Sequence, residues 1–177
     1  SSANILKALA QFMTVMISAD SKYDKYVRNE AGGTFNTQES QGLHLFQNNC
    51  ASCHATDIFT DNSFRNNGLP PNPNLNDLGR AIVTGFPYDR YKFKVPSLRN
   101  VALTAPYMHD GRFGSLESVL NFYSNGMQNT PNLDPLMQQH TALGIPLTQA
   151  EKEAIIAFLQ TLTDEKFISN PAFYYQT

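Results

Sequence analysis

The sequence contains no tryptophan, only two cysteines among 177 residues, and no large excess of charge of either sign. Two cysteines are too few for the common structural zinc sites, which need four ligands and usually a second Cys/His pair. The formal net charge of −2 gives no basic footprint of the kind that binds nucleic acid. No apolar run approaches the roughly 18 residues that cross a membrane. The length instead predicts one sizeable hydrophobic core, with one domain plus appendages.

What the sequence does contain is the pentapeptide CASCH, in which Cys50 and Cys53 are followed directly by His54. This is the C-x-x-C-H pattern that attaches a c-type haem. The spacing lets both thiols reach the two vinyl groups of one porphyrin edge, and it brings the imidazole to the iron as its proximal ligand. A thioredoxin-like C-x-x-C needs a βαβ surround, which this sequence does not predict. Covalent haem attachment takes place outside the cytoplasm, so we expect a periplasmic location for one haem c.

The N-terminal part of the chain predicts two helices joined by a polar connector. Apolar residues recur at helical spacing in residues 4–18. A second helix is expected from Thr37, as its N-cap, with Glu39 in the first turn, where a negative charge suits the helix dipole. Gly42 would let a partner helix approach closely, and Phe46 would fill the gap beside the haem ring.

The C-terminal part predicts two further helices separated from the haem motif by loops. Ser115 is the expected N-cap of one, and Thr148 with Glu151 forms the capping box of the last helix. Residues 55–77 are rich in Asn, Asp, Pro and Gly and predict a loop, which we expect to cover the proximal histidine.

These elements predict an all-α fold, namely a cytochrome c fold with long loops, preceded by a connector helix. The terminal helix is expected to cross the helix that carries the haem motif. The expected organisation is a connector helix and linker, a cytochrome c domain and a short tail, at residues 1–36, 37–165 and 166–177.

The sixth position of the iron has several candidate ligands. A thioether donor favours Fe(II) and raises the redox potential, whereas a phenolate is a hard anionic donor that favours Fe(III) and lowers it, within the roughly 0.8 V that axial ligands command. Met127 follows Asn125 and Gly126, so a loop could place it over the ring. The candidates by chemistry are Met108, Met127, Met137, His44, His109, His140 and Tyr123.

One long segment resembles a known family. Residues 93–111 read FKVPSLRNVALTAPYMHDG, which is similar to a signature of the bacterial di-haem cytochrome c peroxidases and their relatives of the MauG type. Residues 132–135 and the last helix resemble the second half of those proteins, and residues 8–26 resemble their inter-domain connector. The similarity covers essentially the whole chain.

The resemblance implies a place within a larger protein. The family has two cytochrome c domains, each with its own C-x-x-C-H motif, and this chain has one such motif. We therefore expect it to be the C-terminal half of a di-haem protein, without the N-terminal haem domain that binds and reduces peroxide. This half would accept electrons from a small donor, either a cytochrome c or a cupredoxin, and a homodimer is left open. The alternative is a stand-alone mono-haem electron carrier.

The resemblance also implies roles for individual residues. Counting seven residues beyond Leu116 reaches Tyr123, where the peroxidases proper have methionine and the MauG-like members have tyrosine; Met127 or Met108 is the alternative ligand. The carbonyl groups of Thr104 and Pro106 match positions that bind calcium between the two domains, and we expect a weak or empty calcium site in this chain. Residues of the signature that are expected to form the haem pocket are Pro96, Leu98, Arg99 and His109.

Overall fold

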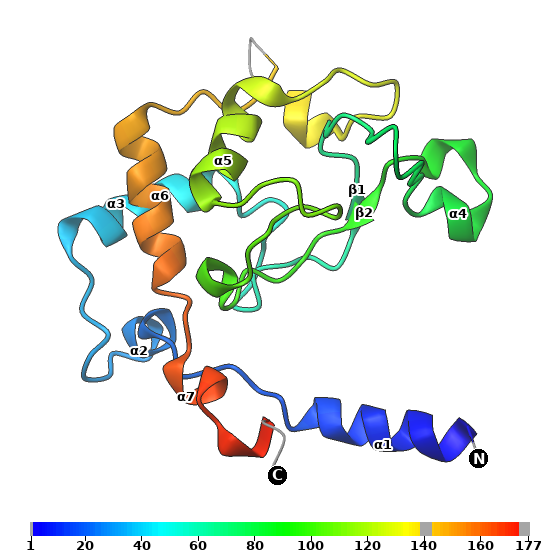
Figure 1. Ribbon diagram of the computed structural model, residues 1–177. Helices are drawn as coiled ribbons and strands as arrows, with labels where there is room; N and C mark the ends of the chain where they lie inside the picture. Colours follow the sequence, from blue (N-terminus) through cyan, green and yellow to red (C-terminus); the bar gives the residue numbers. More distant parts are fainter. Residues whose placement is uncertain (1, 139–142, 174–177) are drawn as a thin grey trace.

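The computed structural model describes residues 2–138 and 143–173. Within these ranges the chain is mostly helical, with one two-stranded sheet, as the sequence predicts (Figure 1). The α-helices are α1 (Ser2–Thr14), α2 (Lys22–Val27), α3 (Thr37–Asn49), α4 (Ala81–Thr84), α5 (Leu116–Asn121), α6 (Gln149–Gln160) and α7 (Glu165–Ile168). The shorter turns of helix are η1 (Pro87–Asp89), η2 (Val101–Leu103), η3 (Phe122–Gly126), η4 (Pro135–Gln138) and η5 (Pro171–Phe173).

The centre of the fold is the crossing of α3 and α6 (Figure 1). Gly42 of α3 lies against the backbone of α6, where an added Cβ would be 1.9 Å from the carbonyl oxygen of Ala154. Glycine is required at this crossing because any side chain would push the helices apart. The predicted close approach at Gly42 is therefore confirmed.

Both central helices begin at capping boxes, which satisfy amide groups that have no partner inside the helix. In α6 the box is Thr148 with Glu151, as predicted. In α3 the N-cap is Asn36 rather than Thr37, and its side chain accepts from the Glu39 amide while the Glu39 carboxylate accepts from the Asn36 amide. The prediction was one residue late because Asn and Thr are both good caps and only the backbone conformation decides between them.

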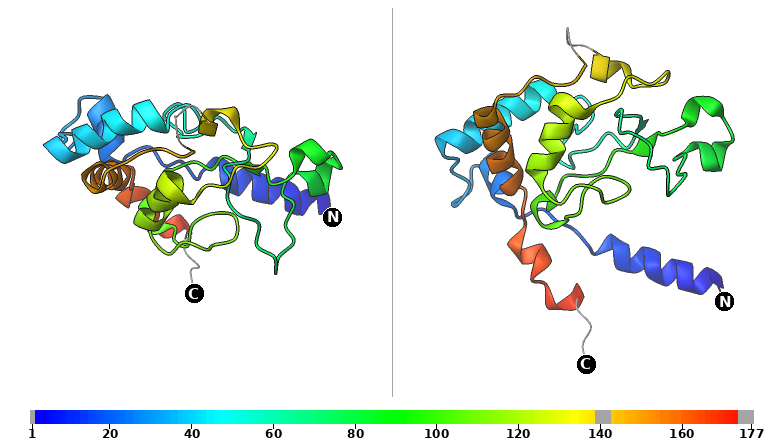
Figure 2. Two further views of the ribbon diagram at one scale, coloured as in Figure 1. Left: turned by 90° about the horizontal axis from the view of Figure 1, so that it is seen from above. Right: turned by 45° about the horizontal axis from the view of Figure 1, so that its top comes forward.

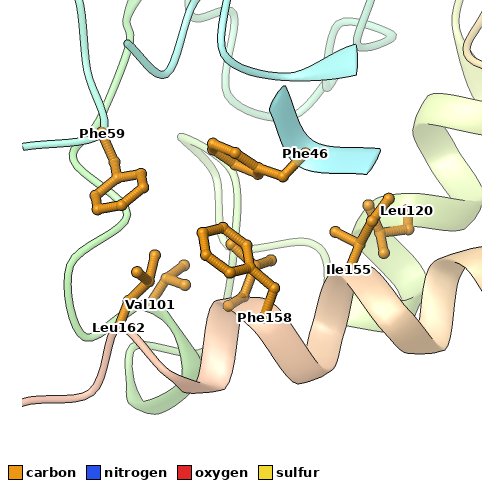
Figure 3. Packing of buried hydrophobic residues seen from close by; sticks show 8 residues of the cluster. Phe46, Phe59, Val101, Leu120, Ile155, Phe158 and Leu162 are labelled. Atoms are coloured by element: carbon orange, nitrogen blue, oxygen red, sulfur yellow. The ribbon is translucent and has the colours of Figure 1, made fainter. Parts of the chain in front are cut away.

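The hydrophobic core fills the space between these helices. Phe158 of α6 is completely buried and packs with Phe46 of α3 and Phe59 of the following loop (Figure 3). The ring centroids of Phe158 and Phe46 are 5.0 Å apart, within the range in which aromatic pairs attract each other beyond simple burial. The same cluster includes Val101, Leu120, Ile155, Leu159 and Leu162.

Residues 18–36, expected to be a linker, pack onto the domain. The Asp24 carboxylate of α2 accepts two hydrogen bonds from the Arg99 guanidinium, at 2.8 and 2.9 Å. The Tyr23 ring lies against Phe59 and Phe158, with centroids 4.9 and 5.9 Å away. The sequence could not indicate this packing, because the Asp24–Arg99 contact joins residues 75 positions apart.

Helix α1 extends away from the rest of the molecule (Figure 2). It ends at Thr14 rather than at the expected residue 18, and all of its residues are exposed. Its apolar side chains therefore have water on most sides, although Phe12 touches Phe173 with centroids 6.1 Å apart. In residues 2–138 and 143–173 we find no helix with the length and hydrophobicity to span a membrane.

The haem motif is followed by long loops on the side away from α3 and α6 (Figure 1). Residues 55–77 form the expected loop except for strand β1 (Phe64–Arg65), which pairs antiparallel with β2 (Phe93–Lys94). Beyond it, the short helix α4 projects outward (Figure 1).

Candidate haem site

The C-x-x-C-H motif lies at the C-terminal end of α3. Cys50 is the C-cap, and its amide still donates to the Phe46 carbonyl at 2.8 Å. The chain then turns, because the amides of Cys53 and His54 both donate to the Cys50 carbonyl, at 3.1 and 2.9 Å. Burial raises the pKa of the Cys50 thiol to about 12 and also raises that of Cys53. Such thiols lack the depressed pKa of redox-active cysteines, which argues against a thioredoxin-like site.

The His54 ring is oriented by the loop that follows it. Its Nδ1 atom lies 3.0 Å from the carbonyl oxygen of Phe59. A carbonyl can only accept, so in the neutral ring Nδ1 carries the proton and donates, which leaves Nε2 unprotonated. Burial lowers the pKa of His54, which favours the neutral ring. The backbone of Pro96 also interacts with this ring and, like that of Phe59, raises its pKa, but by less. A neutral imidazole that donates its other N–H to a carbonyl is the usual form of a metal-ligating histidine.

Tyr123 and all three methionine candidates gather in a second cluster. We call it the methionine–tyrosine cluster. It has a buried centre of Leu69, Phe122 and Met127, against which Met108, Phe113, Tyr123 and Met137 pack. Four segments supply it: η3 and the residue after it, the 55–77 loop with Leu69, the segment after η2 with Met108 and Phe113, and η4 with Met137. Tyr123, Met108 and Met127, the ligands named from the sequence, therefore lie together.

Tyr123 lies in η3, a π-helical turn that directly continues α5. Such insertions are frequent at functional sites because they redirect a side chain from its helical position. The Ile145 amide donates to the Tyr123 carbonyl at 2.8 Å and helps to hold this turn in place. The Asn67 side-chain amide donates to the Tyr123 hydroxyl at 3.1 Å.

The surroundings of the Tyr123 hydroxyl favour its protonated form in the absence of iron. Burial is the main cause that raises its pKa, while the Asn67 hydrogen bond lowers it. An iron cation would oppose this rise, because it favours an ionised oxygen ligand.

The other sixth-ligand candidates differ in their surroundings. His109 is stacked on Phe93, with parallel rings 3.6 Å apart. His44 is exposed on α3 and contacts Asn48. His140 lies outside the described residues.

The residues of the signature segment serve mainly to hold the domain together. Leu98 packs against the core around Phe158. The guanidinium of Arg99 is engaged by Asp24, and Pro96 is exposed. Their predicted contacts with a haem stay predictions, as does that of Phe46, which packs in the core.

Thr104 and Pro106, the predicted calcium-binding positions, both lie on exposed backbone. Their role as calcium ligands therefore also stays a prediction.

Sequence reasoning missed two residues that touch the predicted ligands. Phe59 orients His54 through its carbonyl, a backbone group that any residue offers, so no side-chain pattern could reveal it. Asn67 lies 56 positions before its partner Tyr123 in a loop rich in asparagine. The only available signal was the Asn-Asn-Gly turn at residues 66–68, which predicts a loop and no contact.

The residues present fit a covalently attached haem. Two thiols stand at the motif spacing, a neutral imidazole keeps one unprotonated nitrogen, and the Asn67 amide holds a phenol oxygen near the Met108 sulfur. These are the donor types found around c-type and tyrosine-ligated haem iron.

Comparison with protein families supports the same assignment. The family model for cytochrome c matches residues 39–163. The chain belongs to the cytochrome c family. This confirms the predicted cytochrome c fold, and membership indicates a covalently bound haem c.

Relatives of this cytochrome c domain include a methylamine utilization protein and a cytochrome c peroxidase. The chain is 36% identical over 92% of its length to the methylamine utilization protein MauG of Methylorubrum extorquens, and 35% identical over 92% to the cytochrome c peroxidase Ccp of Escherichia coli. It covers 44% and 33% of those two proteins, so it spans at most about half of their length.

A solved structure agrees with these relatives. A MauG-like protein associated with microbial copper homeostasis superposes with a TM-score of 0.73 at 34% identity, over 88% of this chain and 55% of that protein. The predicted relationship to the cytochrome c peroxidases and MauG is confirmed, and the chain is a cytochrome c domain of a peroxidase-related oxidoreductase family.

Proposed function

We propose that this chain is the electron-transfer haem domain of a periplasmic di-haem protein of the peroxidase and MauG family, with His54 and Tyr123 as the axial iron ligands. The observation that carries the proposal is the position of the Tyr123 hydroxyl, which lies in the methionine–tyrosine cluster and accepts a hydrogen bond from the Asn67 amide at 3.1 Å. The orientation of His54, whose Nε2 atom is unprotonated, supports His54 as the other ligand.

The bound haem would supply an iron that takes up and releases one electron. The Cys50 and Cys53 sulfurs would tether the ring, and the Phe59 carbonyl would keep His54 in the tautomer that binds metal. The Tyr123 oxygen would stabilise Fe(III) and lower the redox potential. With both axial positions taken by side chains, this domain would pass electrons on and would not itself bind peroxide.

Peroxide chemistry would then belong to a second haem domain, the expected partner. Helix α1 supports such a partner, because its apolar side chains are exposed, as they are on a surface that another domain covers. The exposed apolar residues of this helix and its extension are Ile5, Leu6, Leu9, Phe12, Met13, Val15, Met16 and Ile17.

The remaining partners follow from the same proposal. The Thr104 and Pro106 carbonyls would contribute to a calcium site shared with the second domain, and we expect weak calcium binding by this chain because calcium needs six or more oxygen ligands. The electron donor would be a small cytochrome c or cupredoxin.

The alternative function is a stand-alone mono-haem electron carrier. The similarity to MauG and Ccp favours the di-haem interpretation, since both relatives are more than twice as long as their matched region. The exposed apolar helix α1 favours it as well, because a free carrier would gain nothing from keeping such a surface in water.

Replacement of Tyr123 tests the ligand assignment. In the haem-loaded chain, Tyr123→Met should raise the midpoint potential and introduce a methionine–iron absorption band, because a thioether favours Fe(II). Tyr88→Phe, at an exposed tyrosine on η1, is the matched control and should change neither. A potential and a spectrum that are the same in Tyr123→Met as in the wild type would refute Tyr123 as a ligand.

A further inference from the structure

The side-chain amide of Asn67 has a defined orientation in the structure. Its oxygen accepts a hydrogen bond from the Leu69 amide at 3.2 Å. An asparagine side chain has one accepting and one donating end, so its NH₂ group must point the other way. That group donates to the Tyr123 oxygen at 3.1 Å and lies 3.8 Å from the Met108 sulfur.

The backbone around Asn67 is fixed to the segment that carries Tyr123. The Gly68 carbonyl accepts from the Gln128 amide at 2.8 Å. Gly68 has a φ of +76°, and an added Cβ would be 2.8 Å from the Gln128 carbonyl oxygen, so the two segments are in close contact.

The preceding Asn66 is almost completely buried, and its amide donates to Thr130 and Asn132 at 2.9 Å. Its own oxygen accepts from the Gly68 amide, also at 2.9 Å. Asn67 is therefore a preorganised donor rather than a mobile loop side chain.

We propose that Asn67 is a positioning residue that sets the redox potential of this domain through its hydrogen bond to the Tyr123 oxygen. The inference rests on the proposed function, because it requires Tyr123 to be an iron ligand. Asn67 touches no iron itself and acts through the ligand, as outer partners of metal ligands do.

The direction of the effect follows from the chemistry of the donor. A hydrogen bond to an anionic oxygen withdraws electron density, so the oxygen stabilises Fe(III) less strongly. Loss of the Asn67 donor therefore lowers the midpoint potential. Outer partners of metal ligands change affinity by about tenfold or more, and a tenfold change in the preference for Fe(III) corresponds to about 59 mV in a one-electron couple.

The test is a redox titration of the haem-loaded chain, followed by its absorption spectrum. Asn67→Leu removes the donor and should lower the potential, while the spectrum keeps its iron–phenolate features and shows no methionine band. Asn67→Gln retains an amide donor and should stay closer to the wild type. Asn74→Leu, at an exposed position of the same loop, is the matched control and should change nothing.

A second variant keeps the test decisive if Asn67→Leu fails to take up haem. Asn67→Asp has the same size and keeps the acceptor for the Leu69 amide, but it cannot donate when ionised. It should lower the potential at least as far, because its charge also stabilises Fe(III).

The outcomes separate this inference from the function on which it rests. A wild-type spectrum with a methionine–iron band refutes Tyr123 ligation and the role of Asn67 together. A wild-type iron–phenolate spectrum with the same potential in Asn67→Leu, Asn67→Asp and Asn74→Leu refutes the role of Asn67 alone. A methionine band that arises only in Asn67→Leu also refutes it, since Asn67 would then select the ligand instead of adjusting it.

Discussion

The crossing of α3 and α6 makes Gly42→Ala a strongly destabilising substitution. The new Cβ would lie 1.9 Å from the Ala154 carbonyl oxygen and 2.8 Å from the Phe158 Cβ. The first of these atoms is backbone and cannot rotate away, so the helices would have to separate by about 1 Å in a close-packed core. Overpacking of this kind lowers the free energy of unfolding by about 3 kcal/mol, the upper end of the usual range. Replacing glycine by alanine within a helix raises it by about 1 kcal/mol.

The expected net loss for Gly42→Ala is thus about 2 kcal/mol, or a fall in Tm of about 4–8 °C for a chain of this size. Thermal unfolding followed by far-UV circular dichroism measures it. Gly114→Ala is the matched control, because an added Cβ there meets nothing within 4 Å, and it should leave Tm unchanged or slightly raised. Equal Tm values for the two variants would show that α3 and α6 do not meet at Gly42.

Substitutions at Asp24, Asp61 and Thr148 test the packing around the haem domain. Asp24→Asn should cost about 3 kcal/mol in a denaturant titration, because it leaves the guanidinium of Arg99 buried without its partner; a loss below about 1 kcal/mol would mean that residues 18–36 are not packed onto the domain. Burial raises the pKa of Asp61, but hydrogen bonds from Ser63 and Arg65 outweigh it and hold that pKa at about 2. This folded-state pKa lies below the unfolded value of about 3.9, so Asp61 stabilises the fold fully above about pH 3.9 and less as the pH falls towards 2. The difference in stability between wild type and Asp61→Asn should therefore shrink over this window. A difference that does not change with pH would contradict the ion pair. Thr148→Ala should cost about 1 kcal/mol through loss of the helix cap, whereas Thr148→Ser should be nearly neutral; equal losses in both would contradict the capping role.

The parts of the fold that the sequence predicted depend on local chemistry. A capping box begins α6 at Thr148, and Gly42 with Phe46 lies one turn apart on the face of α3 that meets α6. The C-x-x-C-H motif predicted the cofactor, because few other sites use cysteines and histidine at this spacing. In each case, residues within four positions of one another carried the information.

The parts that it could not predict depend on contacts between distant residues. Asp24 meets Arg99, and Asn67 meets Tyr123, although nothing in the local pattern of either residue indicates a partner. The π-helical turn at η3 was also hidden, since the residues of Phe122–Gly126 fit a regular continuation of α5.

The ferric and ferrous absorption spectrum of the purified chain, with a pyridine haemochrome, tests the central claim most directly. We expect one covalently bound haem c per chain and no methionine–iron band in the ferric spectrum, as ligation by His54 and Tyr123 requires. A clear methionine–iron band in the ferric protein would contradict the account and assign the sixth position to Met108 or Met127.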